Sequence, residues 1–286
     1  MITSENRNGW SEIIRPKKSL LDLQLKEVWD YSDLLFMFVR RDFVAGYKQT
    51  ILGPLWFFIQ PLLTTLIFTF VFGNIAEIST DGQPKVLFYL SGLTIWNYFS
   101  ECFTKTSNIF SLNANLFGKV YFPRLISPLS VVVSGLMRFG IQLILLILFV
   151  IYFEILGLSN FNLNIYTLFL PVLLIMMAGF ALGVGMIVSS LTTKYRDLGM
   201  LVTFGVTLLM YATPVIYPIS YVPEKYRYFV GLNPLSPVVE SFRFISIGSG
   251  EFPGFALIYS FFSMIFLLLI GIIVFNKIER TFMDTV

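Results

Sequence analysis

Six long apolar runs, separated by short polar segments, dominate the hydropathy pattern of this chain. A helix that spans a bilayer needs about 20 mostly apolar residues, and six segments meet or approach that length. They run from Leu55 to Phe72, Val86 to Phe103, Leu129 to Phe153, Ile165 to Leu191, Leu198 to Tyr217 and Phe255 to Phe275. The pattern predicts an all-α integral membrane protein whose six transmembrane helices form one domain over residues 55–276.

The segment before the first run, residues 31–54, has a mixed pattern. Its apolar positions are interleaved with charged ones, which are Asp33, Arg40, Arg41 and Asp42. Such a helix suits the bilayer surface, where basic groups face lipid phosphates, and Gly53-Pro54 then ends it. A solvated amphipathic helix that precedes the membrane is the alternative. Residues 1–30 and 277–286 are expected to be a cytoplasmic N-terminal segment and a cytoplasmic tail.

The connection between the fifth and sixth runs, from Pro218 to Gly254, is too long for a turn and too apolar for a water-exposed loop. It contains Pro218, Pro223, Pro234 and Pro237. A re-entrant pair of short helices, dipping into the outer leaflet and returning, explains this composition. Broken backbone survives at membrane depth only where protein or a water-filled cavity covers it. A short surface helix outside the membrane is the alternative.

The composition supports the assignment to the membrane. Of the 286 residues, 56% are hydrophobic and only 13% are charged, whereas soluble domains have about 25% charged residues. No early apolar run precedes a small-residue cleavage site, so we expect the N-terminus to stay on the side of synthesis.

The composition also excludes several kinds of chemistry. The chain has no His and a single Cys, Cys102, which excludes intramolecular disulfides, Cys/His zinc sites and Ser-His or Cys-His dyads. It contains no G-x-x-x-x-G-K-[ST] phosphate-binding loop. The net charge of +3 is spread over the segments that flank the membrane, so no nucleic-acid surface is indicated. We expect no catalytic residue, metal site or cofactor in this chain.

The placement of basic residues predicts the orientation, because Lys and Arg favour the cytoplasmic side. Six spans and an internal N-terminus define which segments face the cytoplasm. Of the 20 Lys and Arg residues, 15 fall on cytoplasmic segments, four fall on outer segments and Arg138 lies within a span. The four outside are Lys85, Lys225, Arg227 and Arg243. Both termini are therefore expected in the cytoplasm.

Arg138 is the one cation well inside a predicted span. An ionisable group at that depth is costly and is by default a functional hypothesis. It can line a pore, pair with a carboxylate such as Glu101, or extend toward the cytoplasm if the span begins late. Glu101 and Lys105 are spaced i, i+4 and can pair with each other, which weakens the Arg138–Glu101 option.

Aromatic residues crowd the first two runs. Flat aromatic faces stack on the apolar faces of sugars, while the polar tips of Tyr and Trp bond hydroxyls, so a glycan pore can be built from them. Interfacial belts and packing against lipid are the better explanation of most individual Phe residues. The candidates to line a channel, with Arg138, are Trp56, Phe57, Tyr89, Trp96, Tyr98, Phe99 and Tyr217.

Two further features concern packing and docking. Gly179 and Gly183 form a G-x-x-x-G in the fourth run, which is a signal for helix packing. The connection between the fourth and fifth runs places Lys194, Tyr195, Arg196 and Asp197 in one tight cytoplasmic turn. That turn can dock into a soluble partner, although any cytoplasmic loop collects such residues.

Five stretches carry a resemblance to a known family. In chain order they are Arg41-Asp42 through Tyr47–Trp56 and on to Gln60–Leu62, Val120–Arg124, Lys194–Asp197, Thr213–Pro218 and Leu232–Leu235. Together they resemble the permease subunits of ABC-2 type polysaccharide exporters, most closely the O-antigen exporters, with teichoic acid and capsule exporters as near relatives. The resemblance spans the chain from Asp33 to the sixth run.

The resemblance implies a homodimer of six-helix subunits in the bacterial inner membrane, paired with two copies of a separate cytoplasmic ABC ATPase that binds ATP and magnesium. It implies an amphipathic interface helix, which fits Asp33–Leu52, and coupling contacts to the ATPase. The matching coupling residues are Asp33, Arg40, Arg41, Asp42, Lys194, Tyr195, Arg196 and Asp197. One departure is Gly46, where relatives often have a basic residue.

The mechanism that the resemblance implies is export of a lipid-linked polysaccharide. Arg40, Arg41 and Lys48 attract the anchor pyrophosphate at the inner leaflet, and the sugar chain passes between the two subunits. This subunit breaks no bond. The alternatives are an ABC-2 permease for another cargo, such as teichoic acid, capsule, a lipid or a drug, and a membrane-embedded glycan-processing enzyme.

Overall fold

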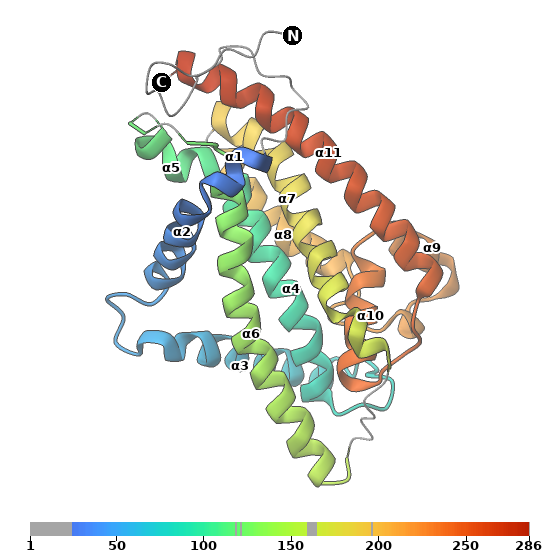
Figure 1. Cartoon of the computed structure of the whole chain (residues 1–286). Coiled ribbons are helices and arrows are strands. Elements are labelled where there is room, and N and C mark those ends of the chain that lie inside the picture. The colour runs from blue at the N-terminus through green and yellow to red at the C-terminus, as the bar shows by residue number, and fades with distance from the viewer. Residues whose placement is uncertain (1–24, 118, 121, 159–164, 196, 286) are drawn as a thin grey trace.

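The computed structural model describes residues 25–117, 119–120, 122–158, 165–195 and 197–285. Within these residues, the regular elements are all helical (Figure 1). The α-helices are α1 (Leu25–Asp30), α2 (Ser32–Ala45), α3 (Trp56–Phe68), α4 (Lys85–Ser107), α5 (Ile109–Phe117), α6 (Ile126–Ile155), α7 (Leu170–Lys194), α8 (Leu198–Ala212), α9 (Glu224–Leu232), α10 (Ser236–Ile247) and α11 (Gly254–Thr285). The predicted all-α class is confirmed.

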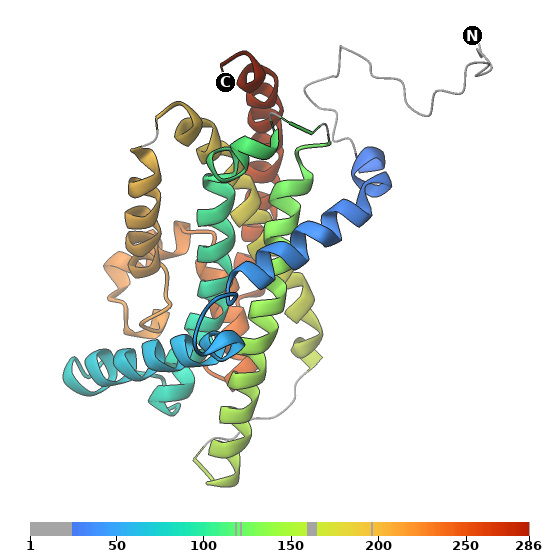
Figure 2. The same cartoon turned by 90° about the vertical axis from the view of Figure 1, so that its left-hand side faces the viewer.

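The bundle is built around α4. This helix contacts α3, α6, α7, α8 and α10, and α7 in turn packs on α11. Figure 1 shows α4, α6, α7 and α11 running roughly lengthwise, with α1 and the C-terminal part of α11 at the same end. In both Figure 1 and Figure 2, α3 lies crosswise to this bundle, and it contacts α4 and α6. The long helices therefore form a core that α3 crosses, and its π-helical continuation, Thr69–Ile75, contacts the start of α4 through Gly73 and Asn74.

Four helical stretches are long and apolar enough to cross a membrane: Gly53–Ile75, Ile126–Ile155, Ile165–Lys194 and Gly254–Ile278. They correspond to the first, third, fourth and sixth predicted spans. The second and fifth predicted spans also form helices, α4 and α8, but neither meets the same criterion. The α8 helix has only 15 residues, and α4 contains charged and hydroxyl residues over much of its length.

Two predicted helix ends are wrong. The fifth helix ends at Ala212, not Tyr217, because Thr213 adopts an extended conformation before Pro214, as residues before proline prefer. The amphipathic helix ends at Ala45 instead of continuing to Leu52. Residues after Ala45 form turns, and Gln49 has a φ of 66°, which is incompatible with a right-handed helix.

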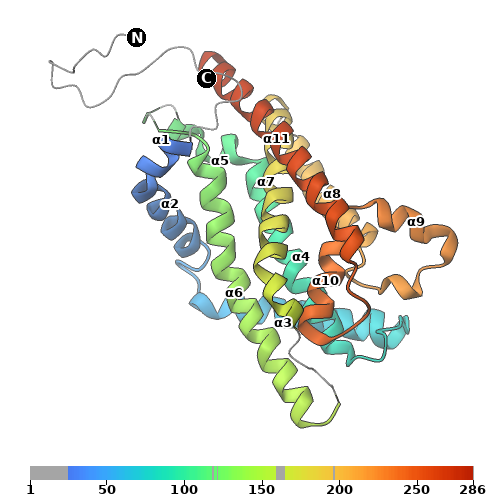
Figure 3. The ribbon, with the colours of Figure 1, turned by 45° about the vertical axis from the view of Figure 1, so that its right-hand side comes forward.

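The connection between α8 and α11 contains two short helices, α9 and α10, as the proline-rich composition predicts. They differ in environment. The α10 helix is largely buried against α4, α7 and α11, whereas α9 has no buried residue. Figure 3 shows α9 at the edge of the molecule and α10 beside α4. The apolar stretch of α10 thus belongs to the protein core.

The G-x-x-x-G of α7 is a packing contact with α11. A Cβ at Gly183 would lie 2.7 Å from the backbone of Leu267 and Leu268, and one at Gly271 would lie 2.5 Å from the carbonyl oxygen of Gly183. The two backbones therefore approach more closely than any side chain allows. Close approach of this kind is what small residues provide in membrane helices, so the packing interpretation is confirmed.

We predict that Gly183→Ala destabilises the protein. The added methyl group would meet backbone, which cannot move aside as a flexible side chain does, and overpacking costs about 1–3 kcal/mol. Gly205→Ala on α8 is the matched control, because nothing lies within 4 Å of its Cβ and Ala is the better helix former by about 1 kcal/mol. Thermal unfolding of the detergent-purified variants measures the difference; equal midpoints would contradict this packing.

Candidate functional site

A cluster of charges lies between α4 and α6. The Glu101 carboxylate forms an ion pair with Arg138, and the same oxygen, Oε1, accepts a hydrogen bond from Lys105 Nζ at 2.6 Å. Pairing with Glu101 was one of the three roles that the sequence left open for Arg138, and the structure shows this pair together with the i, i+4 pair to Lys105. The two pairings do not compete, because a carboxylate oxygen has more than one lone pair.

Arg138 also connects these helices to the segment that precedes them. Its guanidinium donates to the main-chain oxygen of Asp42, near the end of α2, at 3.0 Å. It lies 5.4 Å from the ring centroid of Phe57, in the first turn of α3, which is within range of a cation–π interaction. One side chain thus contacts α2, α3 and α4 from its place on α6.

The end of α2 is held by further polar contacts. The Asp42 carboxylate pairs with Arg41 at 2.8 Å and accepts a hydrogen bond from Ser130 on α6 at 3.3 Å. Arg41 also donates to Asn113 on α5 at 3.3 Å. These two predicted site residues are therefore engaged within the protein.

The other two basic residues predicted to attract phosphate are arranged differently. Arg40 and Lys48 are both exposed. Their cationic groups can reach a headgroup or an anionic ligand without first breaking a contact to the described part of the chain.

A cavity of about 500 Å³ lies beside this cluster, between α3, α4 and α6. Its wall is polar and aromatic in mixture: besides Gly46 and the residues of the ion cluster it includes Trp56, Phe57, Gln60, Thr64, Asn97, Ser100, Thr104 and Gln142. Gly46 faces Arg138, and a Cβ at that position would lie 3.0 Å from the guanidinium. A larger side chain at position 46, such as the basic one expected in relatives, would therefore compete with Arg138 for space.

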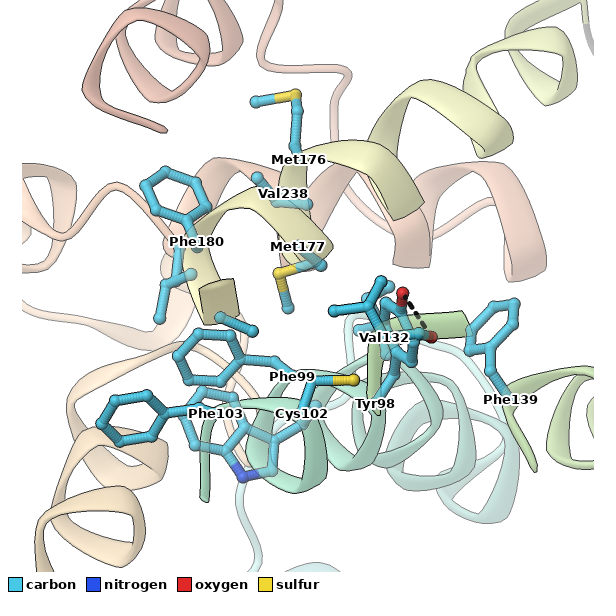
Figure 4. Packing of buried hydrophobic residues seen from close by; sticks show 14 of the residues in the cluster. Tyr98, Phe99, Cys102, Phe103, Val132, Phe139, Met176, Met177, Phe180 and Val238 are labelled. Carbon is cyan, nitrogen blue, oxygen red and sulfur yellow. Dashed lines mark hydrogen bonds between the residues drawn. The ribbon is translucent and has the colours of Figure 1, made fainter. Parts of the chain in front are cut away.

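The aromatic channel candidates divide into two groups. Tyr89, Trp96, Tyr98 and Phe99 on α4 are at most 3% exposed. Figure 4 shows Tyr98 and Phe99 packed among Cys102, Phe139 and Met177, with the Tyr98 hydroxyl near the carbonyl oxygen of Val132. Other side chains of the protein cover the faces of these four rings. The rings therefore offer no surface to a passing sugar in this arrangement.

The second group is more accessible. Trp56 is 40% exposed, and Phe57 is half-buried beside Phe43 and Tyr47. Tyr217 is half-buried and donates its hydroxyl to the carbonyl oxygen of Tyr211 at 3.0 Å. Of these, Trp56 and Phe57 line the cavity and Tyr217 does not.

Most of the residues predicted to contact a soluble partner are exposed, but Asp42 is half-buried. Asp33 and Arg40 are exposed on α2, and Lys194, Tyr195 and Asp197 are exposed in the turn between α7 and α8. Arg196 lies outside the described residues. In Figure 1 this turn lies at the same end of the bundle as α1.

Arg243 is a buried cation that the sequence analysis assigned only to an outer connection. It is 2% exposed, donates to the carbonyl oxygens of Pro214 and Val215 at 2.8 and 2.9 Å, and lies 3.9 Å over the ring of Phe88. The carbonyl oxygens of Pro214 and Val215, which lie beyond the end of α8, thus accept hydrogen bonds from a side chain of α10. The sequence signal for this buried role was the position of Arg243 inside the apolar stretch of α10.

Comparison with known proteins gives a consistent result. Residues 33–247 match the family described as ABC-2 type transporter. The chain is 28% identical over 253 residues to an O-antigen export system permease protein of Klebsiella pneumoniae, covering 88% of this chain and 94% of that protein. It is 29% identical over 224 residues to one of Myxococcus xanthus, covering 77% and 83%. It is 22% identical over 211 residues to a capsule polysaccharide export inner-membrane protein of Neisseria meningitidis, covering 71% and 75%.

We predict that Glu101→Gln destabilises the protein and that adding Lys105→Met recovers part of the loss. The single change leaves Lys105 and Arg138 without their shared carboxylate, and an uncompensated charge in a partly buried site costs on the order of 1–3 kcal/mol. The second change removes one of the two cations. Thermal unfolding of the purified variants tests this. A double variant no more stable than Glu101→Gln would show that Lys105 does not contribute to the charge balance of this cluster.

Proposed function

Because the chain belongs to the ABC-2 type transporter family, we propose that it is the permease subunit of an exporter that moves lipid-linked polysaccharide, of the O-antigen class, across the bacterial inner membrane. The observation that carries the proposal is similarity along most of the chain to permeases whose names state O-antigen export. The chain itself is a transport subunit and not an enzyme.

In this proposal six helices cross the membrane and both termini are cytoplasmic. Besides the four long apolar helices, α4 has 23 residues, about 34 Å at about 1.5 Å per residue, which suffices for a hydrocarbon core of about 30 Å. The 15 residues of α8 extend only about 22 Å. The segment after it, with α9 and α10 re-entering from the outer side, completes that crossing. The interface helix is α2.

The subunit works as a homodimer with two copies of a cytoplasmic ABC ATPase. Only 11% of the apolar window in Gly53–Ile75, the stretch that contains α3, is buried within the chain, and the outward residues of this stretch include Leu63, Leu66, Ile67 and Phe70. This face meets the second subunit and membrane lipid. The ATPase contacts Asp33 and Arg40 on α2 and the Lys194–Asp197 turn. ATP and magnesium bind to the ATPase, and its motion reaches the bundle through those elements.

The substrate is loaded from the cytoplasmic leaflet. Arg40 and Lys48 attract the pyrophosphate of the lipid anchor, as basic groups do at an anionic surface, and Arg41 contributes while it remains paired with Asp42. Because Arg138 links the end of α2 to α4 and α6, a push on α2 reaches the wall of the cavity directly. The sugar chain then passes along the exposed aromatic residues between the two subunits.

A second cargo class is supported by one observation. The capsule polysaccharide export protein of Neisseria meningitidis covers 71% of this chain, so a capsular glycan is the principal alternative to O-antigen. Teichoic acid, lipid and drug cargo have no such relative among those described above. O-antigen and capsular glycan would both require the site chemistry of a glycan exporter.

We predict that deletion of the gene in its native host removes glycan from the cell surface and makes lipid-linked glycan accumulate in the inner membrane. Restoring the gene should reverse both changes, because export is the step that separates the two pools. The measurement is the surface polysaccharide together with the lipid-linked glycan extracted from inner membranes.

The other outcomes are equally informative. Unchanged surface glycan would refute glycan export and leave an ABC-2 permease for another cargo. Loss of surface glycan without accumulation inside would indicate a role in synthesis and support an enzyme. Loss of capsule with intact O-antigen would assign the second cargo class.

A further inference from the structure

The cavity between α3, α4 and α6 has hydrogen-bonding groups that the protein does not use. Asn97 Nδ2 on α4 donates to Gln142 Oε1 on α6 at 3.2 Å. That contact leaves the carbonyl oxygen of Asn97 and the amino group of Gln142 without a protein partner in the described part of the chain. A side-chain amide offers two donors and two acceptor lone pairs, so most of the capacity of this pair is unused, and both residues line the cavity.

The charged groups in the same wall are already engaged with one another. Glu101 contacts both Lys105 and Arg138, and Arg138 also donates to the main chain of α2. The unused capacity includes the buried Arg138 Nε–H, which has no hydrogen-bond partner in the described part of the chain. The neutral amides and the hydroxyls of Ser100 and Thr104 on α4 add to it. A hydroxyl-rich molecule can satisfy both the amides and the Arg138 donor, because each hydroxyl both donates and accepts. An acyl chain would leave the amides without hydrogen bonds, which is costly.

An aromatic residue stands at the same cavity. Trp56 lines it and is 40% exposed, so part of its ring is available for stacking, and indole rings pack well against apolar faces. The volume of about 500 Å³ falls within the usual range for small-molecule sites, which is about 300–1,000 Å³. Amides, hydroxyls and a flat ring are brought together here from three different helices.

We propose that this cavity is a saccharide subsite that holds one or two sugar rings of the exported glycan. The outer atoms of Asn97 and Gln142 bond adjacent ring hydroxyls, each of which is both donor and acceptor, and Trp56 covers the ring face. The inference rests on the proposed function, since it assumes a glycan cargo. The amides and hydroxyls bind the sugar through neutral hydrogen bonds, which are individually weak, and this suits a site that each unit of the chain must leave.

The first test replaces the amide pair with residues of nearly the same shape, Asn97→Leu together with Gln142→Leu. Loss of two neutral hydrogen bonds corresponds to roughly tenfold weaker sugar binding, and we expect a loss of similar size in the rate of surface glycan appearance. Thr207→Val, a polar-to-apolar change on the exposed face of α8 away from the cavity, is the control and should export normally. Export by the double variant at the wild-type rate would overturn the subsite.

The second test reads occupancy directly and does not depend on export. In the complex with its ATPase, reconstituted in lipid, Ser100→Cys is combined with Cys102→Ala and labelled with a small neutral maleimide. Lipid-linked glycan should slow labelling at position 100 several-fold, while a Thr207→Cys control labels at an unchanged rate.

The comparison probe is the same lipid pyrophosphate without sugar, which should have no effect. Labelling that neither probe slows would overturn the proposal, as would equal protection by the sugar-free lipid, which would assign the cavity to the anchor. These failures leave the proposed function intact, whereas unchanged surface glycan after gene deletion would remove the cargo itself.

Discussion

A charge within a membrane-spanning bundle must be compensated by other groups of the protein, and this constraint organises the molecule around Glu101. One of its oxygens contacts Lys105 on the same helix and Arg138 on α6. Arg138 then reaches the main chain of α2 and the ring of Phe57. The interface helix and the start of α3 are thereby joined to the central helices at one place, and the polar cavity lies beside that junction.

Much of the fold could be predicted from hydrophobic periodicity, because a bilayer rewards long apolar helices more clearly than any soluble environment does. The errors have local causes. The apolar run of the fifth helix continues through Val215 and Ile216, so hydropathy does not mark its end, although Pro214 restricts the residue before it. The crosswise direction of α3 depends on contacts with α4 and α6, and no feature of its own sequence encodes that direction.

The parts of the candidate site that contain a charge in an apolar segment could be predicted from the sequence. The parts whose exposure depends on helix packing could not. Arg138 stood out because it is a cation within an apolar run, and its partner Glu101 was among the options. The aromatic residues of α4 pointed to a pore, yet α6, α7 and α10 cover them, and a single sequence does not reveal which face of a helix its neighbours cover. Arg243 was missed for the same reason, since its role arises only when α10 packs beside the unwound end of α8.

The backbone contact between Gly183 and Gly271 has a consequence for motion. Two helices in contact along their main chains cannot slide or rotate past one another without collision, so α7 and α11 form one rigid body, and α4 is joined to it through Gly185, whose Cβ would lie 2.7 Å from Thr106. Displacement of α2, α3 or α8 would leave these close contacts intact, and α3 and α8 also have few buried residues. The helices α4, α7 and α11 thus form the body against which the other elements would move.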